Sequence, residues 1–145
     1  MNYQIEKYTP SFKDSILKVW EKSVLATHDF LRADDFVEIK EMLQNFDFSS
    51  LDVFCLTGDK ELVGFIGLYE TKIEMLFLDP DYMGKGLGKY LMNFAMTNLG
   101  ANEVDVNEQN NHARTFYEML GFKVFGRTEK DDAGREYPIL KMKRI

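Results

Sequence analysis

Hydrophobic and polar residues follow two different periods along this chain. Apolar residues alternate with polar ones over some short stretches, which predicts strands, and recur every three to four positions over others, which predicts amphipathic helices. The strand-like stretches are residues 3–7, 52–57, 62–69, 73–78, 103–106, 122–128 and 137–142. The helix-like stretches begin near Pro10, Asp34, Gly86 and Asn110. The predicted order is β-αα-βββ-α-β-α-ββ, with about seven strands and about four helices.

Turn residues separate these elements where the period changes. Residues 58–60, Gly-Asp-Lys, fit a hairpin turn, and Gly100 and Gly121 follow the last two predicted helices, where a glycine often ends a helix. Helices that alternate with strands in the second half favour a mixed α/β (α+β) architecture, with one sheet covered by helices. No repeat or linker divides the 145 residues, so we expect a single domain, residues 1–145.

The composition of the chain indicates which classes of molecule the protein can bind. Hydrophobic residues make up 45% of the chain and the net charge is −6, which disfavours binding to nucleic acid and mildly favours a cationic acceptor. No apolar run approaches the roughly 20 residues needed to span a membrane, and the first six residues lack the features of a signal peptide. We therefore expect a cytoplasmic protein with no membrane partner. The single Cys55 lies in an apolar strand and is expected to be a buried structural thiol.

A stretch in the middle of the chain carries the strongest signal for a ligand. An apolar strand is followed by a short turn and by Gly84, Gly86 and Gly88, which open a helix. The first turn of a helix has N–H groups without intrahelical partners and carries the positive end of the macrodipole. Lys85 and Lys89 add positive charge. This combination predicts a site for a phosphate group.

The spacing of these glycines excludes two common phosphate-binding motifs. A Walker A loop would require a glycine in place of Met83 and a hydroxyl side chain in place of Tyr90. The dinucleotide fingerprint Gly-x-Gly-x-x-Gly fails because Lys89 and Leu91 stand where its last glycine should be.

Two motifs resemble those of the GCN5-related N-acetyltransferases, the GNAT family. The first is the glycine turn, Met-Gly-Lys-Gly-Leu-Gly at residues 83–88, which resembles the family's Gln/Arg-x-x-Gly-x-Gly/Ala. The second is Asn-Asn-His-Ala-Arg-Thr-Phe-Tyr-Glu-Met-Leu-Gly-Phe at residues 110–122, which resembles Asn-x-x-Ala-x-x-Phe-Tyr-x-x-x-Gly-Phe. Within the family the chain is most similar to the bacterial YjaB-type acetyltransferases, through residues 23–31, 106–110 and 137–138.

The resemblance implies the GNAT fold, with a mixed and mostly antiparallel sheet, and acetyl-CoA as the co-substrate. Its pyrophosphate is expected on the backbone amides of the glycine turn, and its pantetheine arm between the strands at 73–78 and 103–106. Met83 replaces the usual Gln or Arg, which removes a polar side chain from the turn and puts the affinity for the coenzyme in doubt. The residues implied in binding the coenzyme are Leu76, Phe77, Leu78, Met83, Gly84, Lys85, Gly86, Leu87, Gly88, Lys89, Asn110 and Tyr117.

Three residues are candidates for proton transfer. By resemblance, Tyr117 lies near the coenzyme sulfur and is the candidate general acid, although a core aromatic residue would show the same helical spacing. Glu74 is a candidate base on the fourth strand. The alternatives are that Glu74 is only an exposed residue at the strand edge, or that water carries the proton to the solvent. His28, between the first two helices, can position or deprotonate the amine because its ordinary pKa is near 6.5, or it can cap the second helix.

The function predicted from these features is transfer of the acetyl group of acetyl-CoA to a primary amine, either a protein lysine or a small molecule, by direct attack on the thioester. The alternative is a CoA-binding regulatory or sensor module with the same fold and little turnover. The two histidines lie far apart and have no cysteine or carboxylate cluster at ligand spacing, so no metal is expected. Pairing of two copies through the C-terminal strands, giving a homodimer, is compatible with this fold.

Overall fold

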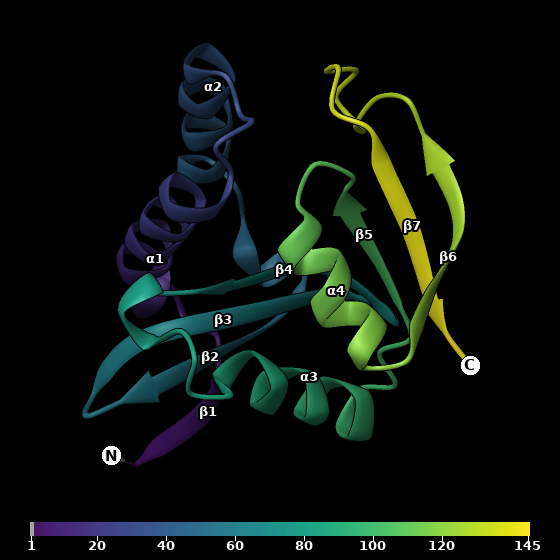
Figure 1. Ribbon diagram of the computed structural model, residues 1–145. Coiled ribbons are helices and arrows are strands. Elements are labelled where there is room, and N and C mark those ends of the chain that lie inside the picture. Colours follow the sequence, from purple (N-terminus) through teal and green to yellow (C-terminus); the bar gives the residue numbers. More distant parts are fainter. Residues whose placement is uncertain (1) are drawn as a thin grey trace.

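The computed structural model describes residues 2–145; Met1, the first residue of the predicted domain, lies outside this range. The strands are β1 (Tyr3–Lys7), β2 (Asp52–Gly58), β3 (Glu61–Tyr69), β4 (Lys72–Leu78), β5 (Glu103–Asn107), β6 (Phe122–Thr128) and β7 (Ile139–Arg144). The α-helices are α1 (Lys13–Thr27), α2 (Ala33–Gln44), α3 (Leu87–Asn98) and α4 (Asn111–Met119). Within the described range the order of elements is the predicted one, and the mixed fold is confirmed (Figure 1).

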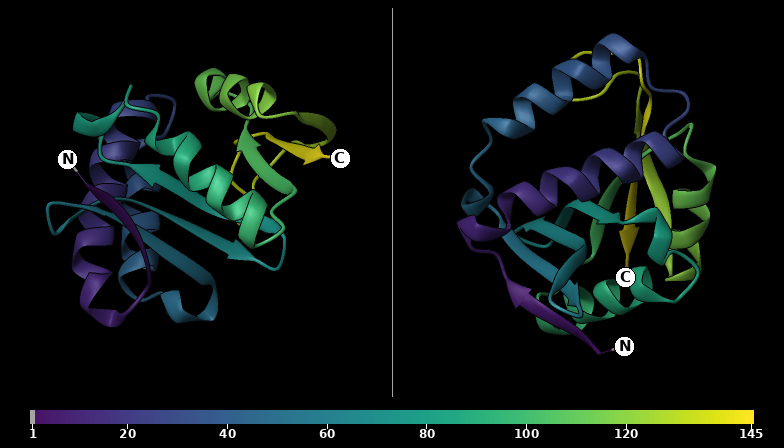
Figure 2. Two further views of the ribbon diagram at one scale, coloured as in Figure 1. Left: turned by 90° about the horizontal axis from the view of Figure 1, so that it is seen from below. Right: turned by 90° about the vertical axis from the view of Figure 1, so that its left-hand side faces the viewer.

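The strands form one sheet in the order β1-β2-β3-β4-β5-β7-β6. Only β4 and β5 are parallel, and every other neighbouring pair is antiparallel. Helices α1 and α2 cover one face of the sheet, and α3 and α4 lie on the other (Figures 1 and 2). The sheet is therefore the middle layer of the molecule, and its two faces carry separate apolar clusters.

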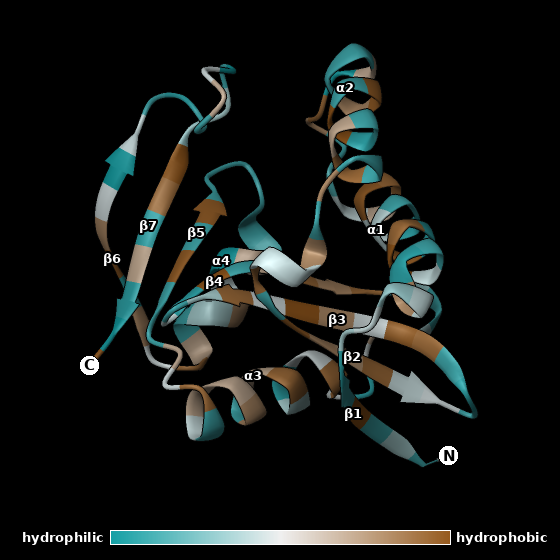
Figure 3. Cartoon of the chain, turned by 180° about the vertical axis from the view of Figure 1, so that it is seen from behind, coloured by the Kyte–Doolittle hydropathy of each residue, from teal (hydrophilic) through white to brown (hydrophobic). Residues whose placement is uncertain are grey.

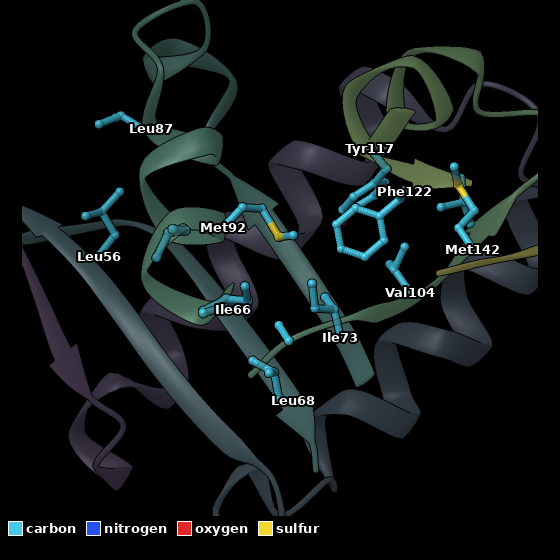
Figure 4. Packing of buried hydrophobic residues seen from close by; sticks show 14 of the residues in the cluster. Leu56, Ile66, Leu68, Ile73, Leu87, Met92, Val104, Tyr117, Phe122 and Met142 are labelled. Carbon is cyan, nitrogen blue, oxygen red and sulfur yellow. The ribbon is translucent and has the colours of Figure 1, made fainter. Parts of the chain in front are cut away.

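Alternation of side chains along the strands supplies both clusters. On β2, Val53 and Cys55 pack toward α1 and α2, whereas Leu56 packs toward α3 and α4. The larger cluster lies between the sheet and the α3/α4 layer, as Figure 4 shows, and apolar positions follow the strands in Figure 3. Full burial of one aliphatic or aromatic side chain contributes about 1.5–3 kcal/mol to folding. The largest fully buried members of both clusters are Phe48, Phe65, Phe122, Ile16, Leu56, Ile66, Leu68, Leu91, Met92 and Met142.

Strands β4 and β5 separate soon after they meet. They pair only at Lys72 with Glu103 and at Ile73 with Val104. Beyond these two pairs β4 continues beside β3, and β5 continues beside β7, so the facing edges of β4 and β5 are left without a strand partner. Figure 1 shows the two strands diverging behind α4. The separation places an opening in the middle of the sheet, as the GNAT resemblance implies.

A β-bulge lies where this opening begins. Leu68 pairs with Ile73 and Gly67 pairs with Met75, so Glu74 is an extra residue on β4. A bulge reverses the side on which the following side chains project. As a result, Ile73 packs in the α3/α4 cluster, whereas Met75 packs against the α1/α2 cluster. The sequence pattern did not predict this irregularity.

Two elements have boundaries that differ from the predicted ones by more than one residue. The first helix begins as a single 3₁₀ turn at Pro10–Phe12, and the α-helix starts at Lys13. The last strand covers Ile139–Arg144, whereas the sequence pattern predicted residues 137–142. Pro138 has no N–H to donate, and the N–H of Tyr137 bonds to the carbonyl of Arg135, so neither residue joins the ladder.

The outer strand β6 leaves Val124 and Phe125 exposed, with relative accessibilities of 38% and 59%. Phe125 is the extra residue where the β6–β7 register shifts. Pairing of two copies through this edge stays a prediction. Across residues 2–145, no helix has the length and apolar character needed to cross a bilayer.

Candidate active site

The opening between β4 and β5 forms a cavity of about 180 Å³. Consecutive residues 73–77 of β4 and 104–107 of β5 form its two walls. His28, from the end of α1, and Asn110, Ala113 and Tyr117, from the start of α4, complete the lining. Along a strand, the N–H and C=O groups of successive residues point alternately to one neighbouring strand and to the other. The N–H of Asp79 bonds to Val63 on β3, so the backbone groups of Asp79 point toward β3. Those of Leu78 and Leu76, one and three residues earlier, therefore point the other way, into the opening.

A second cavity of about 360 Å³ continues from this opening to the glycine turn. It contains Leu76, Phe77 and Leu78 of β4, together with Asn110 and Tyr117 of α4. From the turn and the start of α3 it contains Met83, Gly84, Gly86, Leu87, Gly88 and Lys89. The structure therefore brings together all the residues predicted to bind the coenzyme except Lys85. The predicted acid and one predicted base, His28, line the same cavity.

The glycine turn has a left-handed backbone, with φ of +78° at Gly84 and +74° at Gly86. A Cβ atom built on either glycine would meet nothing within 4 Å, so these positions require glycine for their backbone conformation rather than for lack of space. Gly86 is the N-cap of α3, which leaves the first amides of that helix facing the cavity without side-chain caps. These features fit a bound anion.

The two lysines of the turn differ in position. Lys89 lies in α3 and lines the cavity. Lys85 does not, and its Nζ lies 5.7 Å from the centre of the Tyr82 ring. Met83, which is 40% exposed, forms part of the cavity wall and offers a thioether where the family usually has a polar group. The positive charge near the glycine turn in the second cavity therefore comes mainly from the first amides of α3 and from Lys89.

Tyr117 lies on α4 with only 6% of its surface exposed. Its ring makes edge-on contacts with Phe116 and Phe122, with centroids 5.1 and 5.7 Å away. Burial raises the pKa of its phenol well above the ordinary value of 10. The hydroxyl therefore stays protonated at neutral pH, as a general acid requires. Tyr117 is both a core aromatic residue and a wall of both cavities, so the two predicted interpretations are compatible.

Asn110 is the N-cap residue of α4. Its Oδ1 accepts a hydrogen bond from the N–H of Ala113 at 3.1 Å. The cap occupies the oxygen of the side-chain amide and leaves its NH₂ group for another partner. Since Asn110 lines both cavities, that group is available to a ligand.

His28 lines both of these cavities and also a third one. It is the C-cap residue of α1, so it does not cap α2, and the N-cap of α2 is Arg32. Burial lowers the pKa of its imidazole, although the nearby Asp29 carboxylate partly opposes this shift. The ring is therefore neutral at pH 7 and can accept a proton.

Glu74, the other candidate base, forms an ion pair with a lysine. Its carboxylate lies 3.7 Å from the Lys72 ammonium, which also contacts Asp105 at 2.8 Å. Glu74 is at the closed end of the opening, next to the last β4–β5 pair. It lines the first cavity but not the second, so it lies farther from the glycine turn than His28 and Tyr117 do.

The third cavity, of about 170 Å³, lies between the α1–α2 connection and the segment that precedes β7. Most of its lining is apolar, and Asn107, Asp131 and Tyr137 add polar atoms. The apolar residues that line it are Trp20, Val24, Phe30, Leu31, Ile39 and Phe77.

Side chains from α2 and from the β6–β7 connection form hydrogen bonds and ion pairs with one another at the rim of this cavity. The Tyr137 hydroxyl donates to Asp35 and accepts from the N–H of Arg32 at 3.0 Å. Arg135 bonds to Glu38 and lies 3.6 Å from carboxylate oxygens of both Asp35 and Asp131. Figure 2 shows the segment that precedes β7 beside α2. These pairs hold α2 and the β6–β7 connection together at the rim of the third cavity.

Sequence reasoning missed several residues that line the three cavities. Ser23 and Thr27 belong to the apolar-striped first helix, and Asn107 ends a strand. His112 is exposed, yet it borders the second cavity. No local pattern indicates that these residues line a cavity, because only the tertiary fold brings them to the opening. Among residues 2–145, no three His, Cys, Asp or Glu side chains are grouped to hold a metal ion.

Comparison with known proteins agrees with this architecture. Residues 23–143 match the family described as "Acetyltransferase (GNAT) domain". The chain is 40% identical over 129 residues to the peptidyl-lysine N-acetyltransferase YjaB of Salmonella typhimurium, covering 89% of each chain. Its identity to the YjaB protein of Escherichia coli is 36% over 130 residues, or 89% of this chain and 88% of that one.

Solved structures show the same similarity. The solution structure of apo YjaB from E. coli superposes with a TM-score of 0.92 at 34% identity, covering 100% of this chain and 99% of that one. The crystal structure of PaiA N-acetyltransferase from Thermoplasma acidophilum in complex with coenzyme A gives a TM-score of 0.72 at 25% identity, covering 99% of each chain. The narrower resemblance to YjaB-type proteins is therefore confirmed.

Proposed function

Because this chain belongs to the GNAT family and is an acetyl-CoA-dependent N-acetyltransferase, we propose that its acceptor is the ε-amino group of lysine side chains in proteins. The observation that carries the proposal is the position of His28, where the coenzyme-side cavities meet the apolar third cavity. Four methylene groups of a lysine suit an apolar channel that ends at a neutral base. Two relatives at 40% and 36% identity are named peptidyl-lysine N-acetyltransferases.

The coenzyme binds with its pyrophosphate on the amides between Gly84 and Lys89. The positive end of α3 and the Lys89 ammonium favour a negative charge there. The pantetheine arm runs along the free edge of β4, where the backbone groups of Leu76 and Leu78 are directed at the opening. The thioester then lies in the first cavity, between His28 and Tyr117.

The reaction is a direct transfer with two proton movements. The amine attacks the thioester carbonyl carbon, and the amide of Leu76 or Leu78 stabilises the oxyanion that forms; one such donor can contribute several kcal/mol. The His28 imidazole takes the proton that the amine loses. The carbon–sulfur bond then breaks, and the departing thiolate takes the proton of the Tyr117 hydroxyl. No covalent acetyl-enzyme is required.

His28 is preferred to Glu74 as the base because of its surroundings. Glu74 is paired with Lys72, whereas His28 faces every cavity of the site. Because burial lowers the pKa of His28 from its ordinary value of 6.5, the ring gains its proton only at a more acidic pH. The midpoint of the acidic limb in a kcat/KM profile should therefore lie below pH 6.5, and this limb should disappear in His28→Gln. An unchanged limb in His28→Gln, together with its loss in Glu74→Gln, would transfer the role to Glu74.

The choice of acceptor is tested with three matched substrates. The first is a peptide with one lysine and a blocked N-terminus, the second replaces that lysine with arginine and leaves the N-terminus free, and the third is free lysine. Mass spectrometry and thiol release should show efficient acetylation of the first peptide only. Acetylation of the second or third with higher kcat/KM would contradict the proposal. Coenzyme binding without turnover on any amine would favour a sensor module.

A further inference from the structure

The last turn of α1 contains a short chain of hydrogen bonds that ends at His28. The hydroxyl of Thr27 lies 2.7 Å from the carbonyl oxygen of Ser23, one turn earlier in the helix. The same hydroxyl lies 2.8 Å from Nδ1 of His28. All three residues line the second cavity, and Thr27 and His28 are half-buried. The imidazole is therefore held from one side while its other nitrogen is free to meet a substrate.

The number of hydrogen atoms decides which way these bonds run. A hydroxyl carries a single hydrogen, and a carbonyl oxygen can only accept. Two oxygens 2.7 Å apart need that hydrogen between them, so the Thr27 hydroxyl donates to Ser23, as threonine commonly does inside helices. Its oxygen must then accept from His28, which places a hydrogen on Nδ1.

We propose that Thr27 is a positioning residue that holds His28 in the Nδ1–H tautomer and thereby presents an unprotonated Nε2 to the acceptor amine. In a neutral imidazole, a proton on one nitrogen leaves the lone pair on the other. The kinetic consequence rests on the proposed base role of His28, whereas the tautomer itself does not. A neutral hydroxyl partner, unlike a carboxylate, does not stabilise the imidazolium, which keeps the ring available as a base.

Other groups around His28 do not replace Thr27. Within residues 2–145, the Thr27 hydroxyl is the ring's one hydrogen-bond partner, and Phe30 packs beside the ring with centroids 5.2 Å apart. Asp29, on the same segment, is the charged group that raises the pKa of His28 against the effect of burial. The other titratable groups line cavities that His28 also lines: Glu74 on β4, Asp105 on β5, Tyr117 and His112 on α4, Lys89 on α3, and Asp131 and Tyr137 before β7.

The direct test reads the ring nitrogens by nitrogen-15 NMR. The chain has only two histidines, so the exposed His112 serves as a reference within each spectrum. At pH 8 the wild-type protein should show His28 protonated at Nδ1 and free at Nε2. Thr27→Ser keeps a hydroxyl and should keep this pattern, whereas Thr27→Val should populate the Nε2–H form. A wild-type spectrum with the proton on Nε2 would overturn the inference.

Kinetics then separate this inference from the proposed base role. Thr27→Val should lower kcat about tenfold, the effect of one lost hydrogen bond, while Thr27→Ser restores it and KM for acetyl-CoA stays within about twofold. An Nδ1–H tautomer in an enzyme whose His28→Gln variant retains full activity would refute the base role and leave the tautomer assignment intact. A Thr27→Val variant with the wild-type tautomer would refute the positioning role.

Discussion

The two sides of the proposed active site are built from different parts of the polypeptide. The coenzyme side is almost continuous in sequence, from β4 through the glycine turn into α3, and it offers backbone groups. The acceptor side joins α1, α2 and the segment before β7 through side chains, including a bond from Arg32 to Tyr137 across 105 positions. A binding site made of backbone groups tolerates changes of side chain, whereas a network of side chains changes with each substitution. We infer that the fold determines the specificity for the acetyl donor and that the side-chain contacts determine the specificity for the amine acceptor.

The largest effect is expected where the two sides meet. Tyr117→Phe removes the hydroxyl proposed to protonate the thiolate and keeps the buried ring, so kcat should fall by about 10²–10⁴. The dissociation constant for acetyl-CoA, measured by calorimetry, should stay within about twofold of the wild-type value. Tyr90→Phe, at a 44% exposed position on α3, is the matched control and should leave both constants unchanged. Full activity in Tyr117→Phe would exclude the acid role.

Backbone conformation on the coenzyme side is tested next. Gly86→Val places a β-branched side chain at φ +74°, which costs about 1–2 kcal/mol or more and disturbs the amides of the turn. Acetyl-CoA should bind roughly 5- to 30-fold more weakly. Gly134→Val is the matched control, because Gly134 has a φ of +80° and similarly open surroundings but lies in the β6–β7 connection. Equal loss of coenzyme affinity in both variants would contradict the distinction between the two sides.

A change on the acceptor side should affect KM for the lysine peptide and leave the affinity for acetyl-CoA unchanged. Tyr137→Phe leaves Asp35 and the N–H of Arg32 without their shared partner. An unpaired polar group of this kind costs about 1–3 kcal/mol, so urea unfolding should show reduced stability. KM for the lysine peptide should rise several-fold while the affinity for acetyl-CoA is unchanged. A loss of coenzyme binding instead would show that the network supports both sides.

The smallest effect concerns Met83. Met83→Gln restores the polar side chain that the family usually has at the glycine turn, at a position that lines the second cavity. One added hydrogen bond should tighten acetyl-CoA binding by about 0.5–1.5 kcal/mol, or roughly two- to tenfold, with no change in KM for the peptide. Met96→Gln, on α3 outside the cavity linings, is the control. Weaker binding in Met83→Gln would show that the thioether itself contacts the coenzyme.

Local patterns predicted most of the fold and the coenzyme side. The glycine turn, the Asn110 cap and the hairpin turn depend on backbone conformation and on hydrogen bonds between near neighbours, which short motifs encode. In that hairpin both Asp59 and Lys60 have positive φ, as expected. The mostly antiparallel sheet and the divergence of β4 from β5 were implied by the family resemblance rather than by the pattern itself.

The rest depends on tertiary contacts. The bulge at Glu74 changes which side chains share a face, and a two-residue alternation cannot reveal a single inserted residue. The Arg135 contacts join side chains of α2 and the β6–β7 connection that are 97 positions apart. His28 was a candidate from its chemistry alone, but its position at the junction of three cavities follows from where α1 ends.

A crystal structure with a bisubstrate analogue, in which a lysine peptide is joined through its ε-nitrogen to coenzyme A, tests the two-sided site most directly. We expect the pyrophosphate on the amides of the glycine turn, the sulfur beside the Tyr117 hydroxyl and the lysine nitrogen facing Nε2 of His28. The lysine stem should occupy the third cavity, against Phe30 and Tyr137. A peptide that reaches the sulfur by another path, with the third cavity empty, would contradict the proposed acceptor side.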